Sequence, residues 1–492
     1  MEKFKSIKLN RNSGEHLYTQ LYNSIKQLIM DEDIKANEKL PPIRKLAELL
    51  SLNNITVVKA YSLLEEKNYV YKKIGSGTFV SSVEEEFHRL DDEAYEDMRL
   101  MDRGQIEVRE NVINFASATP TPELFPVGDF KEVLNEVLDR DKGLAFGYQE
   151  SKGYFPLREC IVEYLKIYKI STLVENIQII SGAQQGIDVI SKALLRHGDT
   201  VIVESPTYTG AIATFESRGA KMLQVPVSKE GIDLNVLEGY IERYKPKLIY
   251  TMPNFQNPTG YSYSRRAKKE LLDLAYRKGL IVIEDDYSTD LNFYTDENAT
   301  LKSMDSNENV IYIKSFSKIF MPGLRLGFLV VPRSVNNEIL MAKQASDIST
   351  SGLIQRAFDL YLRKGIWRRH ISYMKKIYKE RFDIMSQSLE EYLPEATIFV
   401  KPAGGINFWI GLVDGFSAKE LYSQSINADI AFIPGGVFYP QEVDSNFLRL
   451  SIADVYPDDI KIGIQRLSQA ITKYYQRNSI RSQKKSIYRP IL

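Results

Sequence analysis

The sequence predicts two folded parts: a small head of helices with a β-hairpin, and behind it a large α/β domain with a mostly parallel sheet. Two observations carry this prediction. From about residue 113 to residue 475, apolar β-rich runs alternate with helical stretches. These runs are continuously apolar, which is typical of parallel strands buried on both faces. At 492 residues the chain is long enough for two or three domains.

The composition is that of a globular protein, with 43% apolar and 26% charged residues. No apolar run approaches the roughly 18 residues of a membrane span, and the charged amino terminus lacks the apolar core of a signal peptide. The single cysteine, Cys160, excludes an internal disulfide, and with only four histidines the sequence predicts no metal site. We therefore expect a cytoplasmic protein without membrane attachment.

The net charge is zero overall but uneven along the chain. Residues 1–80 carry a net charge of +4 and residues 83–110 one of −7, while residues 476–492 hold five basic residues and no acidic ones. A basic head followed by an acidic segment indicates separate modules. We predict a head over residues 1–80, an acidic linker over 81–112, a large domain over 113–475, and a basic tail over 476–492 that is disordered or a surface extension.

Three helices are predicted in the head. Residues 15–30 place apolar side chains at helical spacing, from Leu17 to Ile29. LPPIRKLAELL begins a second helix, because Pro42 suits a first turn, where its missing N–H costs nothing. After the short break SLNN a third helix follows, for which we expect a buried face of Val57, Val58, Tyr61 and Leu64.

A β-hairpin is predicted after the third helix. YVYKKIGSGTFV has two β-rich arms around a Gly-Ser-Gly turn. Two helices separated by a short break fit a helix-turn-helix, and the hairpin would be its wing. Such a head can place its third helix in the major groove of DNA and its wing, with Lys72 and Lys73, beside phosphates. On the pattern alone, a small helical bundle with a hairpin and no ligand is an equal alternative.

Six strands are predicted in the large domain: VENIQIISG, DTVIVESP, KLIYTMPN, LIVIEDDY, NVIYIKSFS and GFLVVP. Polar clusters follow four of them, and ligands of open α/β sheets gather at such strand ends. In SGAQQG a helix starts directly after a strand, so its free N–H groups form an anion site. In PNFQNPTG, Asn257 would project a donor, with an ordinary Asx-type turn as the alternative.

The third cluster, IVIEDDYSTD, places three carboxylates at a strand end: Glu284, Asp285 and Asp286. They could bind a metal, form a surface face, or hold one buried carboxylate against a cation. A pyridinium nitrogen is such a cation, because an ion pair keeps the ring protonated and able to accept electrons.

The fourth cluster, KSFSKIFMPGLRLG, places Lys318 after a strand and among hydroxyls. A lone lysine is usually a solvated charge, but a buried lysine can form a Schiff base. Ser315, Ser317 and Arg325 would then supply hydroxyl and guanidinium donors for a phosphate.

In order and spacing, the four clusters resemble those of fold type I aminotransferases across residues 113–475. LPPIRKLAELL, TVVKAYSLLEEKNYV and GSGTFV resemble the head of the GntR superfamily of bacterial regulators across residues 15–80. A head of this type joined to such a domain is the architecture of the MocR subfamily, and the chain is identified as a member of it. The resemblance implies a fold type I, aminotransferase-like large domain behind a winged helix-turn-helix, with pyridoxal phosphate as cofactor.

The resemblance also implies a role for each cofactor residue. Lys318 would hold pyridoxal phosphate covalently, and Asp285 would pair with its pyridine nitrogen. The remaining contacts would be Asn257 and Tyr287 to the phenolic oxygen, Tyr208 stacked on the ring, and Gly182, Ala183, Gln184, Ser315, Ser317 and Arg325 around the phosphate.

Two further residues are implied at the edge of this site. Tyr148 matches a tyrosine that reaches across a dimer to the neighbouring cofactor. Arg449 matches the arginine that holds a substrate carboxylate, a task that suits a bidentate guanidinium. The expected assembly is a domain-swapped homodimer, with each head near the partner's large domain.

In the head, the resemblance implies DNA contacts from the second helix, the start of the third helix and the wing: Arg44, Asn54, Thr56, Lys59, Tyr61 and Gly77. One position departs from the family, which usually has arginine where this chain has Asn54. Asparagine can read adenine instead, so the base preference does not carry over.

Two functions follow from these patterns. In the first, the chain is a transcription regulator that binds operator DNA and senses an amine, an amino acid or pyridoxal phosphate through Lys318. In the second, it is an active aminotransferase with a fused DNA-binding head. The first is favoured, because the second leaves a complete head unexplained.

Overall fold

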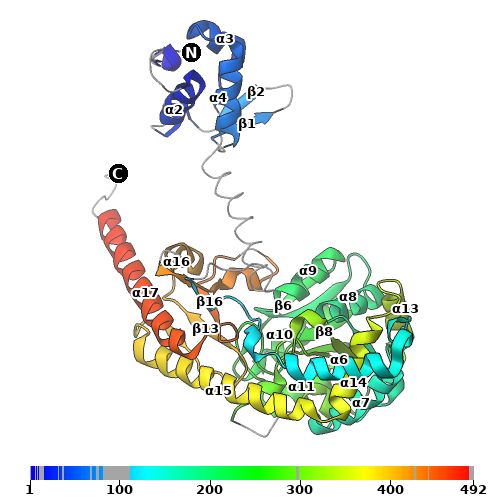
Figure 1. Ribbon diagram of the computed structural model, residues 1–492. Helices are drawn as coiled ribbons and strands as arrows, with labels where there is room; N and C mark the ends of the chain where they lie inside the picture. The colour runs from blue at the N-terminus through cyan, green and yellow to red at the C-terminus, as the bar shows by residue number, and fades with distance from the viewer. Residues whose placement is uncertain are drawn as a thin grey trace. The chain divides into compact units, whose positions relative to one another are not determined.

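The structure of the chain is a computed structural model, and it divides into two compact units, Met1–Asp97 and Met98–Leu492 (Figure 1). It describes residues 2–5, 7, 9, 16–30, 33–35, 38–66, 69–73, 77–80, 111–294, 299–425, 428–441 and 443–486. The predicted acidic linker, except residues 111–112, and the last six residues of the basic tail lie outside this set. Within it, no helix is both long and apolar enough to cross a membrane.

The head is a winged helix-turn-helix, as the sequence predicts. Its elements are α1 (Glu2–Lys5), α2 (Leu17–Met30), α3 (Ile43–Leu49), α4 (Asn54–Glu66), β1 (Val70–Lys73) and β2 (Gly77–Val80). β1 and β2 pair antiparallel with Lys73 opposite Gly77, whose φ of +118° favours glycine. Leu21, Ile25, Leu46, Val57 and Leu64 form its buried core.

The buried face of α4 differs from the expected one at a single position. Val57, Ala60, Tyr61 and Leu64 are at most 2% exposed, whereas Val58 is 44% exposed. The expectation for Val58 is wrong because neighbouring residues of a helix lie about 100° apart. With Val57 at the centre of the buried stripe, Val58 must face outwards.

The large domain contains an eight-stranded sheet in the order β4-β11-β10-β9-β8-β5-β6-β7. Its strands are β4 (Ile177–Ile180), β5 (Thr200–Ser205), β6 (Lys221–Ser228), β7 (Gly231–Ile232), β8 (Leu248–Thr251), β9 (Ile281–Asp286), β10 (Val310–Ser315) and β11 (Gly327–Val330). All six predicted strands are present. β10, β9, β8, β5 and β6 run parallel, and β11 is antiparallel to both neighbours. β6 and β7 were not predicted, because much of β6 is only partly buried and its pattern is weak.

Helices cover both faces of this sheet. Ile202, Ile249 and Val282 point into one core and Val203, Tyr250 and Ile283 into the other, so alternate strand residues face opposite helix layers. The helices of the unit are α6 (Val127–Asp141), α7 (Phe155–Leu165), α8 (Ala183–Leu194), α9 (Thr209–Ser217), α10 (Leu234–Tyr244), α11 (Arg265–Lys278), α12 (Leu301–Met304), α13 (Asn336–Gln344), α14 (Gly352–Arg363), α15 (Ile366–Tyr392), α16 (Ala418–Ser425) and α17 (Pro457–Ser486).

A smaller sheet forms the C-terminal part of the unit, in the order β12-β13-β16-β15. Its strands are β12 (Ile398–Phe399), β13 (Asn407–Gly411), β15 (Ile433–Pro434) and β16 (Phe447–Ser451), and β14 (Ile430–Ala431) pairs separately with β3 (Ile113–Asn114). In Figure 1, α15 and α17 run beside each other next to this sheet. The backbone of α17 stays helical to Ser486, well into the segment predicted as a basic tail.

Candidate cofactor and DNA-binding sites

Lys318 lies in the turn that follows β10 and is half-buried. The hydroxyls of Ser315 and Ser317 are 3.1 Å apart in the same turn, and the Ser317 amide donates to Ser315 Oγ. The next residue, Ile319, is anchored through its carbonyl oxygen, which is 2.9 Å from His370 Nε2 on α15. The lysine therefore sits in a fixed turn at the carboxyl edge of the sheet.

Asp285 is the penultimate residue of the neighbouring strand β9, where it pairs with Ile313 of β10, and it is 2% exposed. The Tyr250 hydroxyl donates to Asp285 Oδ2 at 2.7 Å, while Asp285 Oδ1 is buried with no hydrogen-bond partner. Burial raises the pKa of this carboxyl to about 7. A buried acceptor atom without a donor is costly, so the position fits a cationic donor supplied by a ligand.

The carboxylates on either side of Asp285 are already satisfied by the protein. Strand alternation turns Glu284 and Asp286 to the opposite face of the sheet. Glu284 accepts from the backbone amides of Leu301 and Lys302, both at 2.7 Å. The sequence leaves three alternatives for these carboxylates: a metal site, a surface face, or one buried carboxylate that pairs with a cation. The geometry favours the third. Among the described residues, no group of acidic, histidine or cysteine side chains could hold a metal ion.

Behind Asp285, Lys314 forms a buried ion-pair cluster that the sequence analysis missed. Its Nζ lies 3.2 Å from Asp286 Oδ2 and 2.6 Å from Asp290 Oδ2, and its side chain is fully buried. Burial lowers the pKa of Lys314, but the two carboxylates outweigh it and hold that pKa above its ordinary value. The signal in the sequence is a lysine inside an otherwise apolar strand. This pattern does not show that Asp290 is one of its partners.

Asn257 and Tyr287, both expected near the phenolic oxygen of the cofactor, are hydrogen-bonded to the same third residue. Asn407 of β13 donates from Nδ2 to the Tyr287 hydroxyl at 2.9 Å and to Asn257 Oδ1 at 3.4 Å. The Tyr287 hydroxyl donates in turn to the carbonyl oxygen of Phe255 at 2.6 Å. Sequence analysis missed Asn407, because it follows Asn257 by 150 residues on a strand of the other sheet.

The predicted phosphate site lies where β4 gives way to α8. Gly182 is the N-cap of α8 with φ of +84°, and a Cβ there would lie 2.5 Å from Arg325 Nη2. Arg325 also has a positive φ of +50° and donates from Nη2 to the carbonyl oxygen of Ser181 at 3.1 Å. Glycine thus leaves a cradle between free helix N–H groups and a guanidinium, which suits a phosphate.

Gln184 and Tyr208 flank this cradle. The Gln184 side chain donates to the carbonyl oxygen of Gly210 at 3.0 Å and to Thr214 Oγ1 at 2.7 Å, so only its backbone N–H is available to a phosphate. A Cβ on Gly210 would lie 2.5 Å from the Tyr208 ring. Gly210 therefore provides the space in which the expected stacking tyrosine lies against α9.

Arg449 lies on β16, opposite Trp409, and is fully buried. Its Nη2 donates to the carbonyl oxygen of Ala116, and its guanidinium lies 5.6 Å from the ring centroid of Phe438. On the paired strands, Arg449 faces the same side of the small sheet as Asn407. This placement agrees with a role at the edge of the cofactor site.

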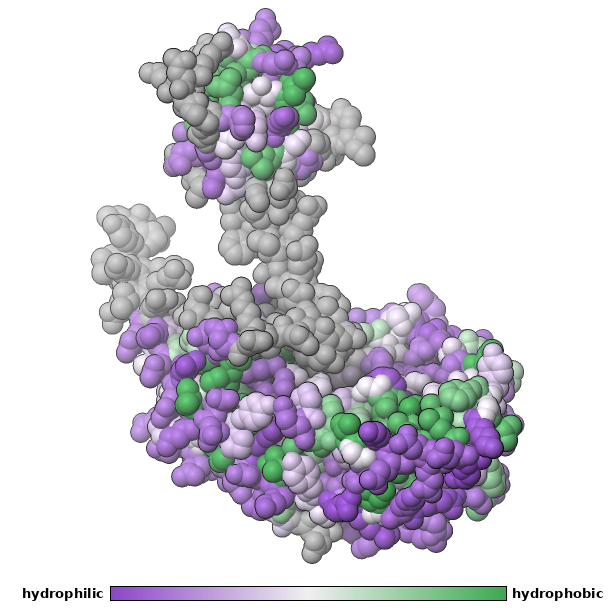
Figure 2. All heavy atoms as spheres, viewed as in Figure 1, coloured by the Kyte–Doolittle hydropathy of each residue, from purple (hydrophilic) through white to green (hydrophobic). Residues whose placement is uncertain are grey.

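Tyr148 does not join this constellation within its own chain. It is 84% exposed and follows a 3-10 turn, η2 (Lys142–Phe146), in which Leu144 is 74% and Phe146 is 70% exposed. Figure 2 shows apolar side chains gathered on the surface over α6, the helix that leads into this turn. Exposed apolar patches of this kind mark contact surfaces.

In the head, four of the expected DNA-contacting residues lie at the surface: Arg44, Asn54, Lys59 and Gly77 are exposed, and Thr56 is partly buried. The expected DNA contact of Tyr61 is wrong, because this side chain is 2% exposed and its hydroxyl donates to the carbonyl oxygen of Pro41 at 2.8 Å. It is a core residue that ties α4 to the start of α3. The side chains of Lys72 and Lys73 are outside the described residues.

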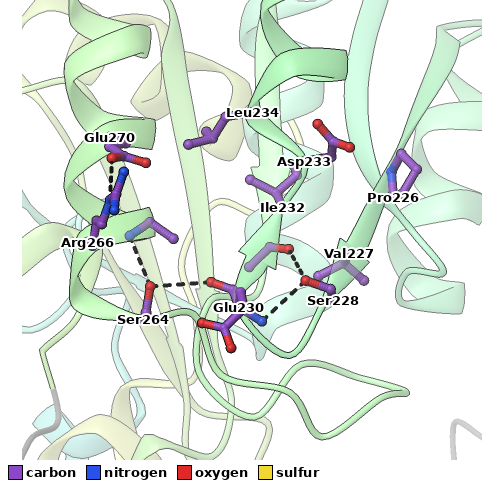
Figure 3. Close-up of a pocket in the computed structure, with 12 residues that line it drawn as sticks. Pro226, Val227, Ser228, Glu230, Ile232, Asp233, Leu234, Ser264, Arg266 and Glu270 are labelled. Atoms are coloured by element: carbon purple, nitrogen blue, oxygen red, sulfur yellow. Dashed lines mark hydrogen bonds and ion pairs between the residues drawn. The ribbon is translucent and has the colours of Figure 1, made fainter.

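A separate hollow lies beside the outer strands β6 and β7, between their turn and α11 (Figure 3). Its polar groups are used within the protein. Ser264 Oγ donates to the Glu230 carbonyl oxygen at 3.4 Å, Glu230 donates from its backbone to Ser228 Oγ at 3.2 Å, and Arg266 pairs with Glu270 at 2.7 Å. The constellation around Lys318 is therefore a stronger candidate for the functional site than this hollow.

The residues around Lys318 fit pyridoxal phosphate. Asp285 Oδ1 lacks a donor that a pyridinium would supply, and Gly182 leaves the space that a phosphate would fill beside Arg325. When bound, this cofactor supplies an aldehyde that condenses with amines and an electron-accepting ring. Fold and site together define a pyridoxal-phosphate-dependent, aminotransferase-like domain joined to a winged helix-turn-helix.

Comparison with known proteins supports this class. The chain belongs to the aminotransferase class I and II family, which it matches over residues 110–467, and it matches the gntR family of bacterial regulatory proteins over residues 17–80. It is 30% identical to the uncharacterized HTH-type transcriptional regulator YdfD of Bacillus subtilis, covering 94% of this chain and 97% of that protein. This similarity over both parts is consistent with a MocR-type regulator.

Two solved structures resemble the large domain. The kynurenine aminotransferase of Pyrococcus horikoshii, in complex with PMP and KYN, is 34% identical with a TM-score of 0.73, covering 77% of this chain and 94% of that one. LysN of Thermus thermophilus, an α-aminoadipate aminotransferase complexed with N-(5'-phosphopyridoxyl)-L-leucine, is 33% identical with a TM-score of 0.70, covering 76% and 97%. Pyridoxal phosphate is thus the cofactor of this chain.

Proposed function

We propose that this chain is a transcription regulator whose head binds operator DNA and whose large domain senses an amine, an amino acid or pyridoxal phosphate at Lys318. The observation that carries the proposal is the presence, on one chain, of a complete winged helix-turn-helix and a cofactor constellation around Asp285 and Lys318. A sensor requires that its ligand bind two states of the protein with different affinity.

Arg449 suggests how such a difference arises. Its guanidinium donates to the carbonyl oxygen of Ala116, which lies just after β3 in the segment that follows the predicted linker. The Ser451 amide donates to the carbonyl oxygen of the adjacent Phe115 at 2.8 Å. A ligand carboxylate would compete with Ala116 for the same guanidinium. Binding would then loosen the segment through which the large domain connects to the head.

A second function, that of an active aminotransferase, is favoured by the same constellation. Arg449, Asp285 and Lys318 would bind, activate and attach an amino acid in either case. The two functions separate in one assay: sustained transfer of amino groups from amino acids to a keto acid, at ordinary enzyme turnover, would favour the enzyme.

We also propose that the chain works as a homodimer joined through the apolar surface near Tyr148. Leu144, Phe146 and Tyr148 are each at least 70% exposed in the single chain, and burying them would remove this apolar area from water. Sedimentation of the holoprotein should give about twice the 56.4 kDa chain mass. A monomer at micromolar concentration would contradict the dimer but leave the cofactor assignment intact.

DNA binding by the head predicts a specific salt dependence. Arg44→Ala and Lys59→Ala should each weaken operator binding and reduce the slope of log affinity against log salt by about one, because each removes one phosphate contact. Fluorescence anisotropy with the full chain and a DNA selected from a random pool measures both quantities.

The matched control is Lys269→Ala, which removes an exposed cation from α11 of the large domain and should leave affinity and slope unchanged. If the two head variants bind like the wild type, the proposed docking of α3 and α4 on DNA is wrong.

A further inference from the structure

The outward face of α4 carries an apolar pair. Opposite its buried stripe, the residues at helical spacing 55, 58, 59 and 62 are all exposed. Two of them are large and apolar: Ile55 is 63% and Val58 is 44% exposed. They are one turn apart, so their side chains adjoin on the surface at the start of the helix.

This pair is exceptional in the head. Among its described residues, no other large apolar side chain is exposed to this degree. β-branched residues are also poor helix formers, so neither helix propensity nor core packing accounts for them on this face. Their position calls for an apolar partner from outside the head.

The start of α4 is held rigidly, as a reading surface must be. Asn53 caps the helix, with its Oδ1 accepting from the Ile55 amide at 3.0 Å. The Tyr61 hydroxyl fixes the next turns to Pro41 at 2.8 Å. Backbone position at Ile55 and Val58 is therefore set by the fold before any ligand binds.

Polar and cationic groups surround the apolar pair. Asn54 and Lys59 are exposed beside it on α4, and Arg44 is exposed on α3. A surface that offers phosphates, base edges and isolated methyl groups together is the major groove of DNA at thymine-containing steps, where the thymine C5 methyl is the one apolar feature. A protein partner or a second copy would be expected to meet a larger and less cationic apolar face.

We propose that Ile55 and Val58 are specificity-determining residues that pack against thymine methyl groups in the major groove. This inference rests on the proposed DNA-binding function and names the base feature that α4 reads. It assigns no base contact to Asn54, the position at which the chain departs from its family.

The test compares thymine with deoxyuridine in the same DNA. A sequence is first enriched from a random pool with the full-length holoprotein, and thymines in its half-sites are then replaced by deoxyuridine, which pairs identically but lacks the methyl group. Wild-type affinity should fall about fourfold for each contacted methyl removed. The variant Ile55→Ala/Val58→Ala should bind the thymine DNA more weakly and bind thymine and deoxyuridine DNA equally.

Two controls keep the result specific. Ser62→Ala changes the same face of α4 one turn further on and should keep the thymine preference of the wild type. The salt slope of Ile55→Ala/Val58→Ala should match that of the wild type, because methyl contacts release no counterions, whereas Lys59→Ala lowers it. An unchanged melting temperature shows that the variant is folded.

The outcomes separate the two proposals. Equal wild-type affinity for thymine and deoxyuridine DNA, or an unchanged preference in the double variant, would overturn the role of Ile55 and Val58 while DNA binding stands. A holoprotein that enriches no sequence would overturn the proposed regulator and this inference with it.

Discussion

Replacing Lys318 by alanine is expected to abolish covalent attachment of pyridoxal phosphate. The lysine sits in the anchored turn after β10, at the strand edge shared with Asp285, and its primary amine can condense with the cofactor's aldehyde. The wild-type holoprotein should be yellow, and borohydride should lock the cofactor onto the peptide that contains Lys318. The variant should lose this adduct completely.

The control for this experiment is the noncovalent site. Asp285 and the Gly182–Arg325 cradle are unchanged in Lys318→Ala, so the variant should still bind pyridoxal phosphate, but release it on gel filtration under denaturing conditions. A colourless wild-type protein that never takes up the cofactor, or an adduct that maps to another lysine, would contradict the assignment.

Replacing Asp285 by asparagine is expected to weaken pyridoxal phosphate binding by roughly 10- to 100-fold, the range of a charge-assisted hydrogen bond of about 1.5–3 kcal/mol. The carboxylate has one buried oxygen without a donor, and an amide there cannot stabilise a pyridinium cation. Titration of the apoprotein by absorbance measures the affinity. Asp359→Asn on α14 is the matched control, because it also removes a buried carboxylate whose pKa is raised by burial.

The same variant should have the opposite effect on the stability of the apoprotein. Burial raises the pKa of Asp285 to about 7 in the folded state, above its value of about 4 in an unfolded chain. The folded state therefore binds an extra proton between pH 4 and 7, and this group lowers the free energy of unfolding as pH rises through that window. Asp285→Asn removes this penalty, so above pH 7 the free energy of unfolding of the apo variant should exceed that of the wild type, by up to about 4 kcal/mol, the equivalent of about three pKa units. If the two apoproteins have the same free energy of unfolding at every pH, the buried Asp285 carboxylate carries no such penalty.

The constellation around Lys318 could be predicted because its residues follow strand ends in a fixed order. Each such end is readable as an apolar run followed by polar residues, and parallel strands bring these ends to one edge of the sheet. Lys318, Asp285, Asn257 and Gly182 became candidates in this way. Their individual roles came from the resemblance to fold type I aminotransferases and remain predictions.

The residues that support them could not be predicted. Asn407 donates a hydrogen bond to Asn257, which is 150 residues away in the sequence. Lys314 forms its ion pairs with Asp286 and Asp290 only in the folded sheet, where β9 and β10 pair. Such partners are fixed by strand register and domain packing, which a local pattern does not contain. Tyr250, the donor to Asp285, looks in the sequence like any apolar strand residue.

In the head, helix periodicity placed the elements but not every face. Val57 and Val58 are adjacent and equally apolar, and only the packed structure decides which of them is buried. Tyr61 follows Val57 by one turn, so the buried stripe carries it into the core and away from DNA.

The central claim is that ligand engagement at Lys318 controls DNA binding by the head. Its most direct test is the DNA affinity of the full chain, measured as apoprotein, as holoprotein and as holoprotein with a panel of amines and amino acids, in wild type and Lys318→Ala. We predict a change of fivefold or more, roughly 1 kcal/mol of coupling, for at least one ligand state of the wild type and none in the variant. Identical affinity in every state of the wild type would contradict the claim.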